Sequence, residues 1–200
     1  PPTLGSVPDD QIKGIDVLLR AVGLVFHTYP EFRNELCLLV VGGALDAQDG
    51  EAETEKIVEL RRLVHEHRLE DTVDFVGSQE QQRLALFYNA ADVCAVPSLT
   101  ESFGLVALEA MACGRPLLVT EAIAHLLPPG YGGAVVVAST DPDCMAIGLR
   151  NALGEHDALE RAAMDTGRRY IAEQPTVGQD LRGLLESSAH TGPSRHQRVV

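Results

Sequence analysis

Two glutamates, Glu101 and Glu109, stand eight positions apart in the stretch SLTESFGLVALEAMACGRPLLVT, which covers residues 98–120. A carboxylate can accept two hydrogen bonds from a vicinal diol, so Glu109 is suited to a ribose and Glu101 to the hydroxyls of a sugar. A helix that begins near Gly104 would offer unpaired backbone N–H groups and the positive end of its dipole, which bind phosphate. Because Gly104 has no side chain, a ligand could approach the backbone closely. The stretch therefore has the chemistry of a nucleotide-sugar site.

A plainer interpretation of the two glutamates needs no ligand. Glu101 would complement the dipole of the helix, and Glu109 would face the solvent. Acidic residues near a helix start are common and short motifs match by chance, so the spacing alone favours this interpretation. The elements that position the two carboxylates must decide between the alternatives.

The segments around this stretch predict an α/β domain. Apolar runs that are typical of strands occupy residues 35–43, 72–77, 92–98, 116–120 and 133–138. Helices are predicted over residues 12–29, 53–68, 80–91, 104–113, 143–153, 155–173 and 176–187. Because apolar strands alternate with helices, we expect a Rossmann-like domain over residues 1–187, with about six mainly parallel strands and helices on both faces. Residues 188–200 should form a flexible tail.

The ends of the predicted strands carry the residues that a ligand would meet. Parallel sheets of this kind bind ligands beyond the carboxyl ends of their strands. Gly42 and Gly43, Gly77 and Ser78, and residues 97–104 all follow predicted strands. We therefore expect these three segments to meet at one edge of the sheet.

The composition excludes several classes of function. The 200 residues have a net charge of −13, which argues against nucleic acid as a partner because phosphate backbones need basic patches. No apolar run approaches the ~18 residues of a membrane span. The start of the chain, PPTLGSVPDD, is not typical of a signal peptide, and we expect it to lie inside a larger protein.

The side chains that most often bind metals give no metal site. The four cysteines lack paired metal spacing, and Cys94 and Cys113 lie in apolar segments, as expected for small core residues in a reducing cytoplasm. His65 and His67 are two positions apart on a charged helix and should lie on the surface, whereas the lone His125 should be structural. The aromatic pair Phe87–Tyr88 fits the packing of a helix.

Five motifs in one order resemble a known family. The stretch ESFGLVALE is similar to the Glu-x7-Glu signature of the retaining GT-B glycosyltransferases of family 4, the group 1 glycosyl transferases. KGIDVLLRA, LLVVGG, VDFVGS and LFYNAADVCAVPS also occur in the order and spacing of the C-terminal, donor-binding domain of that family, over most of residues 11–120. The loop VVGGALDAQDG most resembles the branch of the sucrose-phosphate synthases and the mycothiol-pathway transferases.

The resemblance implies a role for each matched residue. Glu101 would hold the hydroxyls of the donor sugar, Glu109 would bind the ribose, and Lys13 would neutralise the diphosphate, where charge develops on the departing nucleotide. Backbone amides after Glu101 would bind the sugar and the distal phosphate; these belong to Phe103, Gly104 and Leu105. The glycine-rich strand ends would complete the donor site, at Gly42, Gly43, Gly77 and Ser78. Backbone contacts near Gly77 and Ser78 would hold the base, so the sequence does not identify it.

The implied activity is hexosyl transfer. The chain would bind a UDP- or GDP-linked sugar such as UDP-glucose as a substrate, without a further cofactor, and the hexose would pass to an acceptor with retention of configuration. The acceptor-binding N-terminal domain of the family is absent from this chain, so we expect the chain alone to be inactive. Apolar surface that such a domain would cover should then allow self-association.

Two departures from the family keep a second function open. Pro8 stands where the family has an arginine, and the segment EAIAHLLPPG lacks the glycine pair that usually follows the fifth strand. A catalytically inactive GT-B-like domain with a binding or scaffold role is the alternative. The intact Glu101, Glu109 and Lys13 oppose it.

Overall fold

The computed structural model describes residues 14–42, 55–101, 104–138, 140–173 and 197–199. Its helices are α1 (Ile15–Thr28), α2 (Glu55–Glu66), α3 (Gln81–Ala90), α4 (Leu105–Ala112), α5 (Glu121–Ala124), α6 (Pro142–Gly154) and α7 (His156–Glu173), with a 3-10 helix, η2 (Pro30–Asn34). Its strands are β1 (Leu36–Val41), β2 (Val73–Gly77), β3 (Cys94–Val96), β4 (Leu117–Thr120), β5 (Ala134–Val137) and β6 (Gln197–Val199). The predicted helix over residues 176–187 lies outside the described residues.

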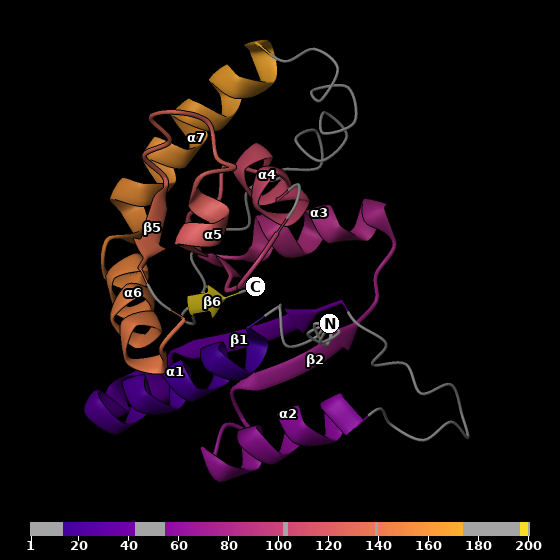
Figure 1. The fold of residues 1–200 in the computed structure, drawn as a ribbon, viewed down its shortest axis with the longest axis vertical. Coiled ribbons are helices and arrows are strands. Elements are labelled where there is room, and N and C mark those ends of the chain that lie inside the picture. The colour runs from indigo at the N-terminus through magenta and orange to yellow at the C-terminus, as the bar shows by residue number, and fades with distance from the viewer. Residues whose placement is uncertain (1–13, 43–54, 102–103, 139, 174–196, 200) are drawn as a thin grey trace, which may run out of the picture.

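The strands of the described part of the chain pair in parallel throughout. β1 lies between β2 and β6, and β4 lies between β3 and β5. A parallel bridge between Val93 and Val199 joins the two groups of three, which gives the order β2–β1–β6–β3–β4–β5. This arrangement confirms the predicted α/β fold with six parallel strands (Figure 1).

The end of the chain departs from the expected flexible tail. Residues 188–196 lie outside the described residues, but Gln197–Val199 form β6, which pairs with Leu36–Leu38 of β1. Val199 is completely buried. Three residues are too few to show a strand pattern, so the pairing comes from the neighbouring strands and not from local preference. The tail prediction is therefore corrected for these three residues.

The sheet has an apolar core on each face. In β4, successive side chains point to opposite faces: Leu118 packs with α1 and α6, whereas Leu117 and Val119 pack with α3 and α4. Helices α1, α2 and α6 form one layer, and α4 packs between α3 and α7 on the other side (Figure 1). The two layers leave the carboxyl ends of the strands to the connecting segments.

Candidate functional site

The carboxyl ends of β1 and β2 meet, as the sequence predicts. The backbone N–H of Gly42 donates a hydrogen bond to the carbonyl of Gly77 at 2.8 Å. Both residues have positive φ, 107° and 75°, a conformation that glycine adopts far more readily than other residues. Ser78 follows directly and is exposed, while Gly43 lies outside the described residues. The two glycine turns therefore leave the sheet side by side.

The ends of β3 and β4 meet in the same way. The Thr120 hydroxyl, at the end of β4, donates a 2.6 Å hydrogen bond to the backbone carbonyl of Ser98, just after β3. Both residues are buried, with 3% of their surface exposed. This bond fixes the main chain three residues before Glu101, which is half-buried. Thr120 is also the N-cap of α5, a short helix that the sequence did not predict.

Two helices begin beside the end of β3. Gly14 precedes α1 and Gly104 precedes α4, and both have left-handed backbone angles, with φ of 66° and 62°. A Cβ on Gly14 would overlap the carbonyl oxygen of Pro97, and one on Gly104 would come within 3.0 Å of the Leu126 side chain. The absence of side chains therefore lets both helix starts approach their neighbours. Glycine also offers no side-chain acceptor to the first amides of each helix.

The residues predicted around these helix starts are only partly described. Lys13, next to Gly14, and Phe103, next to Gly104, lie outside the described residues. Leu105 begins α4 with 63% of its surface exposed. The structure therefore places the neighbours of Lys13 and Phe103 at the end of β3 but does not test the roles of these two residues.

Glu109 has a partner that sequence reasoning missed. The Tyr88 hydroxyl, from α3, donates a 2.8 Å hydrogen bond to Oε2 of Glu109, which lies in the second turn of α4 and is half-buried. Burial and the nearby Glu109 carboxylate raise the pKa of Tyr88 well above its usual value, so the hydroxyl remains a donor. No local signal joins two residues 21 positions apart, and the sequence context of Tyr88 predicts only that it packs in a helix. Glu101 thus lies in the loop before α4, and Glu109 lies in the second turn of that helix.

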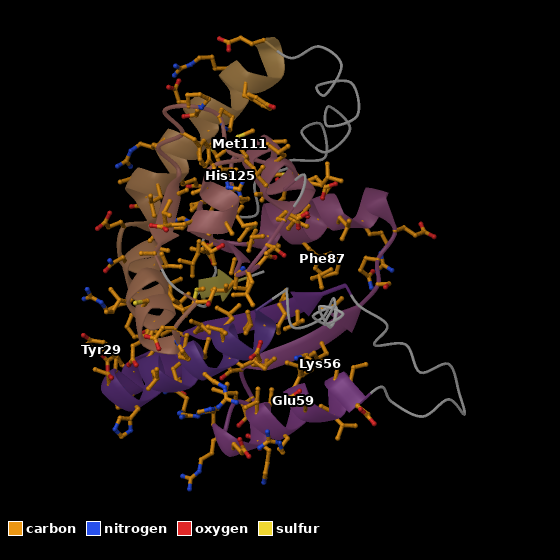
Figure 2. The ribbon with its side chains drawn as sticks, viewed as in Figure 1. Tyr29, Lys56, Glu59, Phe87, Met111 and His125 are labelled. Atoms are coloured by element: carbon orange, nitrogen blue, oxygen red, sulfur yellow. The ribbon has the colours of Figure 1, made fainter. Side chains whose placement is uncertain are left out.

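The histidines His65, His67 and His125 lie in or just after α2 and α5. Nδ1 of His65 lies 2.8 Å from Oε1 of Glu70, and both side chains are exposed. His67 is half-buried and packs against Gly23 of α1. His125 is exposed at the end of α5, while Met111 is buried in α4 (Figure 2). The described residues contain no group of three or more metal-binding side chains.

The remaining features agree with a packed domain. Cys94 and Cys113 are buried, and burial raises the pKa of the Cys113 thiol to about 12. Lys56 and Glu59 pair at 3.7 Å on α2, in the layer below β1 and β2 in Figure 2. Among the described residues, no helix is long and apolar enough to span a membrane.

Comparison with known proteins identifies relatives of the chain. The family described as "Glycosyl transferases group 1" matches residues 3–155. The D-inositol 3-phosphate glycosyltransferase 2 of Catenulispora acidiphila is 40% identical over 169 residues, which are 84% of this chain and 37% of that protein. The D-inositol 3-phosphate glycosyltransferase of Actinosynnema mirum is 37% identical over 186 residues, which cover 88% and 41% of the two chains. The chain therefore spans about two fifths of the length of the curated relatives it matches.

Solved structures share the fold. Sucrose-phosphate synthase from Thermosynechococcus elongatus has a TM-score of 0.66 and 30% identity, over 89% of this chain and 44% of that one. HepE from Anabaena, in complex with UDP-glucose, has a TM-score of 0.64 over 88% and 45% of the two chains, and its identity of 23% shows the fold alone. Because the family matches residues 3–155 and the fold agrees, the chain belongs to the group 1 glycosyl transferases and has their GT-B Rossmann-like fold.

Proposed function

We propose that this chain is the donor-binding domain of a retaining hexosyltransferase and binds a nucleoside diphosphate sugar. The convergence of strand ends and helix starts carries the proposal. The ends of β1 and β2 join through Gly42 and Gly77, the ends of β3 and β4 join through Ser98 and Thr120, and Gly14 places the start of α1 against β3. In open α/β sheets this edge is where ligands bind.

In this proposal the two carboxylates bind different parts of the nucleotide sugar. Glu109 accepts hydrogen bonds from the vicinal hydroxyls of the ribose, and Glu101 accepts them from the hydroxyls of the hexose. The amides at the start of α4 bind the diphosphate, because a helix start favours negative charge. The roles of Lys13 and Phe103 are proposed from their match to the family motifs. Their chain neighbours Gly14 and Gly104 precede the helices α1 and α4.

The same groups can assist the transfer step. The bond between the anomeric carbon and the diphosphate oxygen breaks, and negative charge develops on the departing diphosphate. A bond from the anomeric carbon to the oxygen of an acceptor hydroxyl forms, and the proton of that hydroxyl passes to the departing diphosphate. Donors and cations already aimed at that oxygen lower the barrier, since they need no reorganisation during the reaction. Glu101 contributes by holding the hexose in line for transfer. Retention of configuration is inferred from the Glu-x7-Glu signature at Glu101 and Glu109.

The proposal takes a UDP-linked donor by analogy with the fold neighbour HepE, which is described in complex with UDP-glucose. The curated relatives are named inositol 3-phosphate glycosyltransferases, and the solved structure at 30% identity is a sucrose-phosphate synthase. None of these names favours the inactive alternative that Pro8 and the missing glycine pair kept open. The pattern of buried thiols fits a protein of the cytoplasm.

Acceptor binding belongs, in this proposal, to an N-terminal partner domain. Leu99, Leu105 and Val106 expose apolar side chains before and within the first turn of α4. Such a domain would cover them, and without it the chain would self-associate through them. Sedimentation at rising concentration tests this point, and a constant monomer mass would contradict it.

Calorimetry on the chain tests the donor site. UDP, GDP and ADP are compared with their glucose conjugates, and we expect UDP and UDP-glucose to bind. Glu109→Gln should weaken both about tenfold or more, because two hydrogen bonds to a charged acceptor are weakened. Glu121→Gln, an exposed acid on the nearby α5, is the control and should change neither. The absence of binding by every nucleotide, at concentrations up to millimolar, would refute the proposal.

A further inference from the structure

We propose that Tyr88 is a positioning residue for the ribose of the donor: its hydroxyl holds the Glu109 carboxylate in the orientation that accepts the vicinal diol. The inference rests on the proposed function of Glu109. It adds a residue from a different helix, α3, to the site on α4.

The placement of Tyr88 fixes where its hydroxyl can act. The ring lies in the apolar core with Ala85, Ala107 and Ala110, and only 5% of the residue is exposed. A buried hydroxyl without a partner is costly, so a buried tyrosine keeps its oxygen at a polar group. That group is Oε2 of Glu109, at 2.8 Å. The core thus holds the ring of Tyr88 in place, and the ring fixes the position of its hydroxyl oxygen.

The direction of the hydrogen bond is also fixed. The Tyr88 hydroxyl stays protonated, because burial and the adjacent carboxylate both oppose its ionisation. It therefore donates and the carboxylate of Glu109 accepts. A carboxylate has about four lone-pair positions. One is taken by Tyr88, and Oε1 together with the second position on Oε2 remains for two ribose hydroxyls.

The consequence is a carboxylate that is oriented before the ligand arrives. A free glutamate side chain loses rotamer freedom on binding, which weakens affinity. Held by Tyr88, Glu109 has already lost part of that freedom. Removal of the hydroxyl should therefore weaken binding of the diol and leave the contacts of the base and the phosphates unchanged.

The structure offers a matched control in Tyr131. This tyrosine packs against the same cluster, and burial raises its pKa as it does for Tyr88. Its hydroxyl donates to the backbone carbonyl of Arg115 at 3.3 Å, whereas that of Tyr88 donates to Glu109. Tyr131→Phe and Tyr88→Phe both remove one oxygen from a buried ring. Only the second removes a hydrogen bond to the proposed ribose acceptor.

The test compares UDP with 2′-deoxy-UDP by calorimetry, in the unaltered chain, Tyr88→Phe, Tyr131→Phe, Glu109→Gln and the double variant Tyr88→Phe/Glu109→Gln. Thermal unfolding monitors the stability of each protein. Tyr88→Phe should weaken UDP roughly five- to twentyfold, only part of the factor for a hydrogen bond to a charged group because Glu109 is reoriented and not removed, and change 2′-deoxy-UDP little. Tyr131→Phe should leave the ratio of the two affinities as it is. The double variant should bind UDP no more weakly than Glu109→Gln, because the two residues act as one unit.

The outcomes separate this inference from the proposed function. If Tyr88→Phe keeps the preference for UDP over 2′-deoxy-UDP while Glu109→Gln abolishes it, Glu109 binds the ribose and the positioning role of Tyr88 is wrong. Additive losses in the double variant would overturn that role as well. If the unaltered chain binds UDP but does not distinguish it from 2′-deoxy-UDP, the ribose role of Glu109 fails, and the inference fails with it.

Discussion

Gly14→Ala tests the contact that brings α1 to the end of β3. The left-handed backbone at this position, with φ of 66°, costs a residue other than glycine about 1–2 kcal/mol. The added Cβ would also overlap the carbonyl oxygen of Pro97 and lie within 3.0 Å of its carbonyl carbon. Overpacking of this kind costs about 1–3 kcal/mol, so we expect a total loss of about 2–5 kcal/mol. For a domain of this size the melting temperature should fall by roughly 4–20 °C.

Two other glycines separate the contributions of strain and overlap. Gly42 has a φ of 107° but nothing within 4 Å of an added Cβ, so Gly42→Ala should show the cost of strain alone, about 1–3 kcal/mol. Gly154, at the end of α6, has neither a positive φ nor a close neighbour, and Gly154→Ala should be neutral or slightly stabilising.

Urea unfolding followed by circular dichroism measures all three variants. Gly14→Ala should also weaken UDP, because α1 must move away from the end of β3. Gly154→Ala should leave UDP binding unchanged. If Gly14→Ala loses no more stability than Gly42→Ala, the close contact with Pro97 is not present in solution. The start of α1 would then not belong to the proposed site.

Four further predictions test the site and the fold. Glu101→Gln should weaken UDP-glucose about tenfold and spare UDP in calorimetry, because its partner is the hexose; equal losses for both ligands would contradict the division of roles. Val199→Asp should cost about 3–5 kcal/mol in urea unfolding, since it buries a charge in the middle of the sheet, whereas Val136→Asp, at a position 47% exposed on β5, should cost much less. Similar costs for the two would exclude β6 from the folded sheet. The free energy of unfolding should fall as the pH rises from about 9 to 12, because the folded chain keeps the Cys113 proton that the unfolded chain loses near pH 9. Cys113→Ala should reduce that fall by the share of its thiol, since the buried Tyr88 and Tyr131 hydroxyls also keep their protons there. An unchanged slope would show that the thiol is not buried. Cys144, which is only half-buried, should react with a thiol reagent before Cys113 does.

The sequence by itself determined most of the elements and their order. Periodicity and apolar runs predicted α1, α4 and the five strands from β1 to β5, because each is long or apolar enough to carry its own pattern. The rule that ligands bind at the carboxyl ends of parallel strands then grouped Gly42 with Gly77, and the structure joins them by a hydrogen bond. The motif around Glu101 identified the family, which the comparisons confirm.

Only the tertiary structure decided the contacts between distant residues. β6 has three residues and no pattern of its own, and its place beside β1 depends on backbone groups 161 positions away, as at Leu38 and Val199. The bond from Tyr88 to Glu109 arises because α3 packs against α4, and no local preference in either helix encodes that distance. Local patterns report how a segment buries its own side chains, whereas the partner of a buried hydroxyl is chosen by whichever polar atom the packed core places within hydrogen-bond reach.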